Sequence, residues 1–463
     1  MSKVDLTAIV VACPIRMTPE SKSHSFRCLS FTCRPRQFAV AARIALLQPQ
    51  QHLPMNASAR PVSSAPSRER QILLVITLMS FTNVVDFMVM MPLSPHLMRE
   101  FGIDTTQFGL LVSAYAFAAS AASLLMASIA DRFDRKNALL VVYAGLIVGT
   151  LGCALAPNYP SLLAARTVAG LFGGVQGSIA FSIVGDLVPD ERRGRAMGLV
   201  MLSMSLSAVL GVPLSIYVAA HGGWHLPFFA LAATCALLFV VALRLIPHMR
   251  GHIRAQTAQG VWTGLWRGYA ELLRVPNHWW AFATSALLTL SGMIVIPYIA
   301  PSRITNEGMS EVQLAYFYLV GGAVTLFSRP LFGRMSDRFP RAIVYYWLVL
   351  LSIAPMLLIT HTLGVTLFWQ LVVAALFFIF VSGRFIPSMA LVTAATTPQL
   401  RGRMMSFNSA VQNLFTGLAA VIGGAMLSHA PGGRLAGFEA VGLLSCLFAL
   451  ASLWTAFKIR TVS

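Results

Sequence analysis

The stretch ASIADRFDRK, residues 127–136, places five charged side chains at the end of a long apolar run. The chain repeats most of this stretch as GRMSDRFPRA at residues 333–342. The aspartates of the two copies, Asp131 and Asp337, lie 206 residues apart, and the glutamines 24 positions before them are related by the same offset. A repeat of this length indicates a duplicated half-protein.

The composition indicates a membrane protein. Hydrophobic residues make up 57% of the 463 residues, only 11% are charged, and the mean hydropathy is +0.72. This leaves too little polar surface to cover a soluble domain. The six cysteines have neither metal-ligand nor disulfide spacing, so no metal or cofactor is expected. The sequence contains neither a nucleophile–base set nor a phosphate-binding loop, so we do not expect an enzyme.

The first part of the chain differs from the rest. Residues 1–54 are rich in arginine and poor in acid, and their longest apolar run is too short for a secretion signal. This composition is open to two interpretations, a transit peptide or a segment that precedes a true start at Met55. In either case we expect residues 1–70 to be disordered.

From residue 71 onward, apolar runs of about 20 residues, the length that a bilayer requires of a helix, alternate with short polar breaks. The sequence predicts twelve spans, at 71–92, 107–129, 137–156, 160–187, 196–219, 225–246, 278–299, 312–333, 342–361, 365–394, 403–427 and 437–457. These predict two six-helix bundles, 71–246 and 278–458. A linker with an interfacial helix, 247–277, joins them, and a short tail, 459–463, follows.

The basic residues gather on one side of the predicted spans. Arginines and lysines follow the even-numbered spans and flank both ends, whereas the opposite side shows only Arg99, Arg303 and Arg434. By the positive-inside rule, the repeated motif and both termini are cytoplasmic. We expect the chain to lie in the cell (inner) membrane. The net charge of +18 is then mostly a topology signal, and nucleic acid is not an expected partner.

Four features resemble the major facilitator superfamily, within it the twelve-span drug:proton antiporter branch, similar to arabinose-efflux permeases. The first is the loop motif Gly-x-x-x-Asp-Arg-x-Gly-Arg-Lys, in which Ala127 and Asp134 here replace glycines. The second is Arg166, followed by Gly170 and Gly174 in the fourth span. The third is SAVLGVPLS, residues 207–215, which keeps Gly211 and Pro213 of an antiporter motif in shifted form. The fourth is the pair of matching loops PDERRGRAMG (189–198) and PQLRGRMMS (398–406).

The resemblance implies that the loop motif is a gate that locks the two bundles together. Its residues here are Asp131, Arg132, Arg135, Lys136, Gly333, Asp337, Arg338 and Arg341. A carboxylate is favoured at a helix N-terminus, which supports a lock. The alternative is that these charges only set the topology, but topology requires Lys and Arg and not aspartate. The two replaced glycines suggest a looser lock.

Three ionisable residues stand out inside the predicted spans, Asp86, Arg166 and Arg384. Such residues are costly there and are functional candidates by default. Thr82 and Asn83 share a helical face with Asp86, and we expect this face to line a water-filled cavity. The hypothesis is that Asp86 carries a proton, that one arginine adjusts its proton affinity, and that the other meets the substrate. The alternative is a permanent Asp86–arginine pair that holds helices together.

The candidate substrate cavity combines Thr82, Asn83, Met90, Arg384, Asn408 and Gln412, although interhelical hydrogen bonding explains the last two equally well. The sequence therefore predicts a monomeric, proton-coupled transporter that exports a small drug-like or sugar-like molecule by alternating access. Proton-coupled uptake of an organic anion is the main alternative, because two arginines face one aspartate. A receptor or scaffold that transports nothing is an alternative of another class.

Overall fold

The structure, a computed structural model, describes residues 66–129, 133–249, 268–361, 364–397, 400–430 and 434–461. The first helix of the described residues begins at Pro66, so residues 66–70, which we expected to be disordered, are helical. The predictions for residues 1–65 and for most of the linker, residues 250–267, fall outside the described residues.

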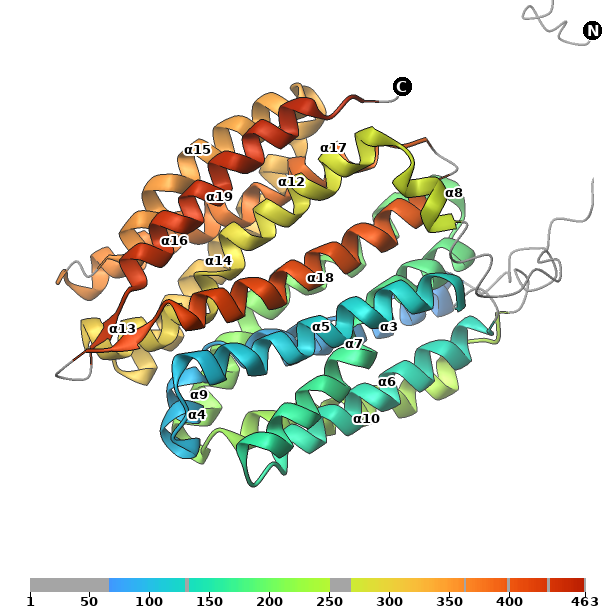
Figure 1. The fold of residues 1–463 in the computed structure, drawn as a ribbon. Helices are drawn as coiled ribbons and strands as arrows, with labels where there is room; N and C mark the ends of the chain where they lie inside the picture. The colour runs from blue at the N-terminus through green and yellow to red at the C-terminus, as the bar shows by residue number, and fades with distance from the viewer. Residues whose placement is uncertain are drawn as a thin grey trace, which may run out of the picture. The chain divides into compact units, whose positions relative to one another are not determined.

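The N-terminal half is built from helices that run back and forth beside one another (Figure 1). Its elements are α3 (Pro66–Val89), α4 (Ser94–Phe101), α5 (Thr105–Ile129), α6 (Arg135–Ala154), α7 (Tyr159–Leu187), α8 (Asp190–Leu206), the π-helical η2 (Ser207–Gly211), α9 (Val212–Gly222) and α10 (His225–Leu245).

The C-terminal half repeats the pattern. Its elements are α12 (Pro276–Met293), the short 3-10 helix η4 (Ile296–Tyr298), α13 (Ile299–Glu307), α14 (Glu311–Arg338), α15 (Arg341–Thr360), α16 (Leu367–Gly383), α17 (Phe385–Ala394), α18 (Arg401–Ala425) and α19 (Phe438–Lys458). A small antiparallel pair, β1 (Ser428–His429) and β2 (Leu435–Ala436), joins α18 to α19.

Most predicted span limits fall within about three residues of the observed helix ends, because the apolar runs are continuous and end at polar breaks. Eleven helical segments of the described chain are long and apolar enough to cross a membrane. Helix α18, which corresponds to the predicted span 403–427, is not among these eleven. Its 25 residues are enough to cross a membrane, but Asn408, Gln412 and Asn413 make it more polar than the others. The largest deviation is the seventh span, which reaches Glu307 through a turn at η4 instead of ending at residue 299.

Two helices are broken near the residues that the sequence analysis singled out. The π-helical turn η2 ends two residues before Pro213, which has no N–H to donate to the turn that precedes it. The tenth span is interrupted at Arg384, which ends α16 and begins α17. Both breaks were within runs predicted as continuous spans.

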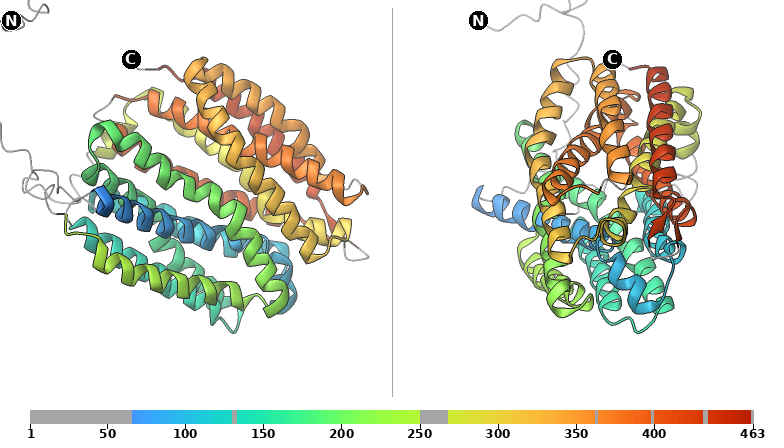
Figure 2. Two further views of the ribbon diagram at one scale, coloured as in Figure 1. Left: turned by 180° about the vertical axis from the view of Figure 1, so that it is seen from behind. Right: turned by 90° about the vertical axis from the view of Figure 1, so that its left-hand side faces the viewer.

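The two halves touch along two seams. In the first, α5 lies beside α18 (Figure 1), and hydroxyls of α5 donate to backbone carbonyls of α18, from Thr105 to Gly424 at 3.0 Å and from Ser120 to Ala410 at 2.8 Å. In the second, η2 and α9 pack against α14, where a Cβ on Gly322 would lie 2.4 Å from the carbonyl oxygen of Ala208. Figure 2 shows the same packing of helices from behind and from the side.

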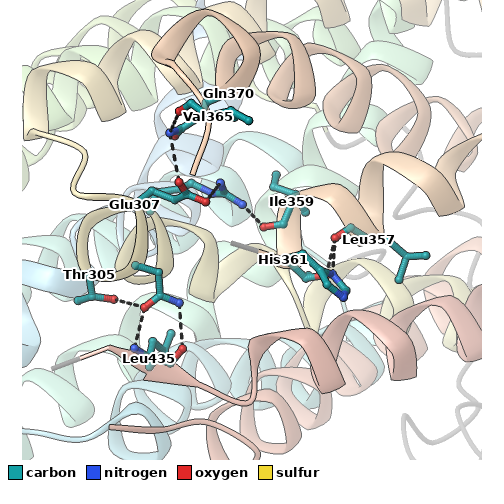
Figure 3. A network of polar contacts seen from close by, with 11 residues as sticks. Thr305, Glu307, Leu357, Ile359, His361, Val365, Gln370 and Leu435 are labelled. Atoms are coloured by element: carbon teal, nitrogen blue, oxygen red, sulfur yellow. Dashed lines mark hydrogen bonds and ion pairs between the residues drawn. The ribbon is translucent and has the colours of Figure 1, made fainter. Parts of the chain in front are cut away.

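A polar network joins α13 to its neighbours (Figure 3), and in it the Asn306 side chain donates to the carbonyl of Leu435 on β2 and accepts its N–H. Glu307 lies between two partners, with Gln370 Nε2 3.4 Å from its Oε2 and Arg303 Nη1 3.4 Å from its Oε1. Arg303 also donates to the carbonyl of Ile359. Because the Arg303 and Glu307 side chains are both buried, this pair is a structural clamp at the end of the C-terminal half opposite the motif loops.

Candidate functional site

Asp86 and Arg166 form an ion pair inside the N-terminal half. Nη1 of Arg166, on α7, lies 3.3 Å from Oδ2 of Asp86, on α3, and 3.1 Å from the Asp86 carbonyl oxygen. Thr150, on α6, donates to Oδ1 at 2.8 Å. Both charged side chains are fully buried. The sequence left open which arginine pairs with Asp86, and the structure identifies it as Arg166.

The pair continues into a chain of polar contacts. The guanidinium carbon of Arg166 lies 4.5 Å from the centroid of the Tyr115 ring, a cation–π contact. Tyr115 donates its hydroxyl hydrogen to Oδ1 of Asn83 at 3.3 Å, and Nδ2 of Asn83 lies 3.3 Å from Oε1 of Gln176. Nε2 of the buried Gln176 has no hydrogen-bond partner among the described residues, so this series of polar contacts ends in an unpaired N–H donor.

Thr82 does not line a water-filled cavity here. Its hydroxyl lies 2.7 Å from that of Tyr143 on α6, and its side chain is buried inside the N-terminal half, as is that of Asp86. Met90 is also fully buried and belongs to an apolar cluster. The predicted cavity-facing surface of α3 is thus covered by α6 and α7 in this structure, and a substrate role for these residues stays a prediction.

Arg384 is buried in the C-terminal half, and among the described residues no carboxylate lies within 4 Å of it. Its Nη1 donates to Ser352 on α15 at 3.1 Å and its Nη2 to Ser291 on α12 at 3.0 Å, while Nε has no partner among the described residues. Arg384 therefore points into its own half. The structure does not bring it near Asp86, which has Arg166 as its partner.

The two polar candidates of α18 differ in their surroundings. Asn408 is buried, and neither its Oδ1 nor its Nδ2 has a hydrogen-bond partner among the described residues. Gln412 is half-buried. An unpartnered buried amide is costly, so Asn408 is a candidate for a polar contact made in another conformation or with a bound molecule.

The first copy of the gate motif is only partly described, because Asp131 and Arg132 fall outside the described residues. Arg135 is buried and its Nε lies 3.2 Å from Oδ2 of Asp186 at the end of α7. Lys136 donates to the carbonyl of Leu243 on α10 at 2.8 Å. Both described contacts stay within the N-terminal half, so a lock between halves stays a prediction.

Asp134, which replaces a motif glycine, has a definite structural role. Its Oδ1 accepts the backbone N–H of Lys136, which caps α6, and also that of Met249 at 3.1 Å. Its Oδ2 lies 2.7 Å from Nδ1 of His248. A glycine could make none of these side-chain contacts. The replacement therefore anchors the beginning of the linker to the motif loop.

The second copy of the motif is exposed. The side chains of Asp337 and Arg338 have no hydrogen bond or ion pair with any described residue, and a Cβ on Gly333 would meet nothing within 4 Å. Arg341 donates to the carbonyl of Ala390 on α17 at 3.3 Å. The repeat thus preserves the residues of the motif without the close packing of the first copy.

The antiporter-like segment is the π-helical turn η2, and it contacts both halves. A Cβ on Gly211 would lie 2.2 Å from the Val85 side chain, next to Asp86, and Ser207 donates to the carbonyl of Phe81 on α3 at 3.0 Å. Its other side packs against Gly322 of α14. Gly211 therefore packs on the helix that carries Asp86, and Pro213 lies in the first turn of α9, which packs against α14 at the seam.

Sequence reasoning missed several polar residues of this region. Thr150 and Tyr115 contact the ion pair, but single hydroxyls are common in apolar spans and carry no signal of their own. Arg329 could have been found, because it is a cation inside the predicted span 312–333. It lies on α14 and its Nη1 donates to Ser205 of α8, across the seam, at 3.1 Å.

These features define the class of protein, a multi-pass membrane transport protein made of two helical bundles. The sequence profile of the Major Facilitator Superfamily matches residues 76–379 and 324–462. The chain belongs to this superfamily, and it is a transporter and not an enzyme.

Relatives and solved structures agree with this assignment. The chloramphenicol resistance protein of Streptomyces lividans is 26% identical over 377 residues, which cover 80% of this chain and 91% of that protein. YtbD of Bacillus subtilis (strain 168), an uncharacterized MFS-type transporter, is 23% identical over 72% of this chain and 85% of its own length.

Two solved structures share the fold. A bacterial homolog of the human lysosomal transporter Spinster, inward-facing and unoccupied, has a TM-score of 0.65 and 21% identity, over 86% of this chain and 95% of that chain. The inward-open xylose transporter XylE from E. coli has a TM-score of 0.66 and 16% identity, over 85% and 97%.

Proposed function

We propose that the protein is a proton-coupled secondary active transporter that exports a small organic molecule by alternating access. The observation that carries this proposal is the ion pair of Asp86 with Arg166, buried between membrane-spanning helices. Protonation of the carboxylate would remove the attraction and leave the arginine buried without a counter-charge, which is strongly unfavourable. Proton uptake at Asp86 would therefore favour a rearrangement of α3 against α7.

A contact route leads from this pair to the seam between the halves. Val85 packs against Gly211 of η2, and Ala208 of η2 packs against Gly322 of α14. Each contact leaves no room for a Cβ, so a movement of α3 displaces η2 and with it the seam. Alternating access requires such a link between the proton site and the relative position of the halves.

Export is supported by the relative from Streptomyces lividans, which is named a chloramphenicol resistance protein and matches most of this chain. We further propose that the chain lies in the cell membrane as a monomer, with the motif loops and both termini in the cytoplasm. In this orientation the motif residues would be the cytoplasmic gate. Asn83, Met90, Asn408 and Gln412 would become accessible to substrate when the halves separate. Thr82 and Arg384 point into their own halves, so they would meet substrate only after a further rearrangement of the helices around them.

Proton-coupled uptake of an organic anion is the second candidate. It is favoured by one observation, that Arg329 and Arg384 have no carboxylate within 4 Å among the described residues. Both candidates use Asp86 as the proton site, and they differ in the direction of substrate movement.

Transport in proteoliposomes with an imposed pH gradient tests the proposal. Chloramphenicol serves as the first probe. The orientation of the protein is determined from a tag on the side of the motif loops, which an added protease cleaves only where that side faces outward. Export predicts that chloramphenicol moves against the proton flow, and that the Asp86→Asn variant loses this movement. Movement of a substrate along with the protons would establish the uptake alternative, and proton-independent flux would overturn the coupling.

A further inference from the structure

Four of the arginines in the membrane-spanning helices differ in how their charge is balanced. Arg166 is paired with Asp86, and Arg303 is paired with Glu307. Arg329 and Arg384 donate only to neutral oxygens, and no described carboxylate lies within 4 Å of either. Hydroxyl groups satisfy the donors of a guanidinium but do not cancel its charge.

The internal repeat shows that the C-terminal half lacks the acid that the N-terminal half has. The offset of 206 residues between the motif copies relates Asp86 to Gly292 and Thr150 to Met356. The guanidinium of Arg384 lies beside Gly292, the position that corresponds to Asp86. It donates to Ser291, and a Cβ on Gly292 would lie 3.8 Å from Nη2 of Arg384. The arginine is thus present beside α12, and its counterpart carboxylate is absent.

Arg329 lies where the halves meet. It extends from α14 to Ser205 of α8 and is only partly buried, so separation of the halves at this seam would free its guanidinium. Arg384, by contrast, is fully buried and fixed by hydroxyls of α12 and α15. Of these two arginines without a carboxylate, Arg384 is therefore held in place and Arg329 is free to move when the halves separate.

We infer that the transported molecule is neutral or anionic and that lipophilic cations are excluded, with Arg329 as its contact at the seam and Arg384 as a fixed positive charge behind it. This inference rests on the proposed transport function and specifies its substrate class. Salt screens charges inside a membrane protein only weakly. An arginine without a counter-charge therefore attracts or repels another ion even when several residues separate the two. A cationic molecule between the halves would meet this repulsion, and an anionic one would be attracted.

Binding of two ions of nearly equal size and shape but opposite charge isolates this effect. Tetraphenylborate and tetraphenylphosphonium are titrated against the protein in lipid nanodiscs, with empty nanodiscs as the background. The wild type should bind the anion about tenfold more tightly than the cation. A tenfold ratio of dissociation constants corresponds to a modest difference in electrostatic interaction energy. This measurement does not depend on transport, so its failure is distinct from failure of the proposed function.

Two pairs of variants decide whether the arginines cause the preference. Gly292→Asp supplies the missing carboxylate beside Arg384, and Gly292→Asn adds the same volume without charge. Arg329→Gln removes the charge at the seam, and Arg329→Lys keeps it. The preference for the anion should fall severalfold in Gly292→Asp and Arg329→Gln and persist in the two controls. Equal binding of both ions by the wild type, or equal effects within each pair, would overturn the inference.

Discussion

The carboxylate of Asp86 lies 3.3 Å from Nη1 of Arg166, and this contact joins α3 to α7 at full burial. A buried pair of this kind contributes little net stability compared with apolar residues, but the loss of one member leaves the other charge unpaired. The two residues should therefore behave as a unit in mutagenesis.

The Asp86→Ala variant should be destabilised by about 3–5 kcal/mol, because Arg166 remains buried without its counter-charge. The double variant Asp86→Ala/Arg166→Met should be more stable than the single variant. Thermal unfolding in one detergent measures both. Additive losses in the double variant would show that the two side chains do not depend on each other.

The side chain of Asp134 should stabilise the protein although it departs from the family motif. Asp134→Ala removes the cap of α6 and the contacts to the linker, and a lost cap costs about 1 kcal/mol. Asp337→Ala is the matched control, since Asp337 is exposed and has no described partner. Thermal unfolding should separate the two variants, and an equal response would refute the structural role of Asp134.

A side chain on Gly322 should disturb the seam. The Cβ of Gly322→Ala would lie 2.4 Å from a backbone oxygen, so α14 must move away from η2. We expect slower transport at an equal amount of protein in the membrane. Gly185→Ala, on α7 and with nothing within 4 Å of the added Cβ, should transport at the wild-type rate. A normal rate for Gly322→Ala would remove the η2 contact from the mechanism.

Tyr269 should make stability depend on pH at the alkaline end. It donates its hydroxyl to the Leu124 carbonyl of α5 at 2.7 Å, and burial raises its pKa above the ordinary value of 10.0. A raised pKa means that the stabilisation is complete below about pH 10 and is lost as the pH rises through the folded-state pKa.

Tyr269→Phe should lose about 1 kcal/mol near neutral pH, the value of one hydrogen bond, and should lack this alkaline loss. Unfolding curves of both proteins from pH 8 to 11 provide the measurement. Parallel pH profiles of the two proteins would contradict the assignment.

The sequence predicted the helices well, because bilayer length fixes the apolar runs and polar loops end them. It also identified Asp86 and Arg166, since ionisable residues are rare in spans. It could not assign their pairing, because Arg166 and Arg384 look alike until the helices are placed in space. The first of them meets a carboxylate on α3, and the second meets serines on α12 and α15.

Other features depend on contacts that no local pattern reveals. Asp134 looked like a damaged motif position, and only its distance to His248 and Met249 shows that it anchors the linker. The break at Arg384 does have a local cause, because Pro387 has no N–H to donate to Gly383 and its ring crowds that carbonyl, but the sequence analysis predicted one continuous span there. Arg329 carried the same signal as Arg384 and was overlooked.

The central claim is that Asp86 carries the coupled proton, and one comparison tests it most directly. Chloramphenicol counterflow and pH-gradient-driven chloramphenicol transport are measured side by side for wild type and Asp86→Asn, below the unfolding temperature of the variant. A neutral residue at position 86 should retain exchange of substrate across the membrane and abolish the response to the pH gradient. Undiminished pH-driven transport in Asp86→Asn would contradict the claim.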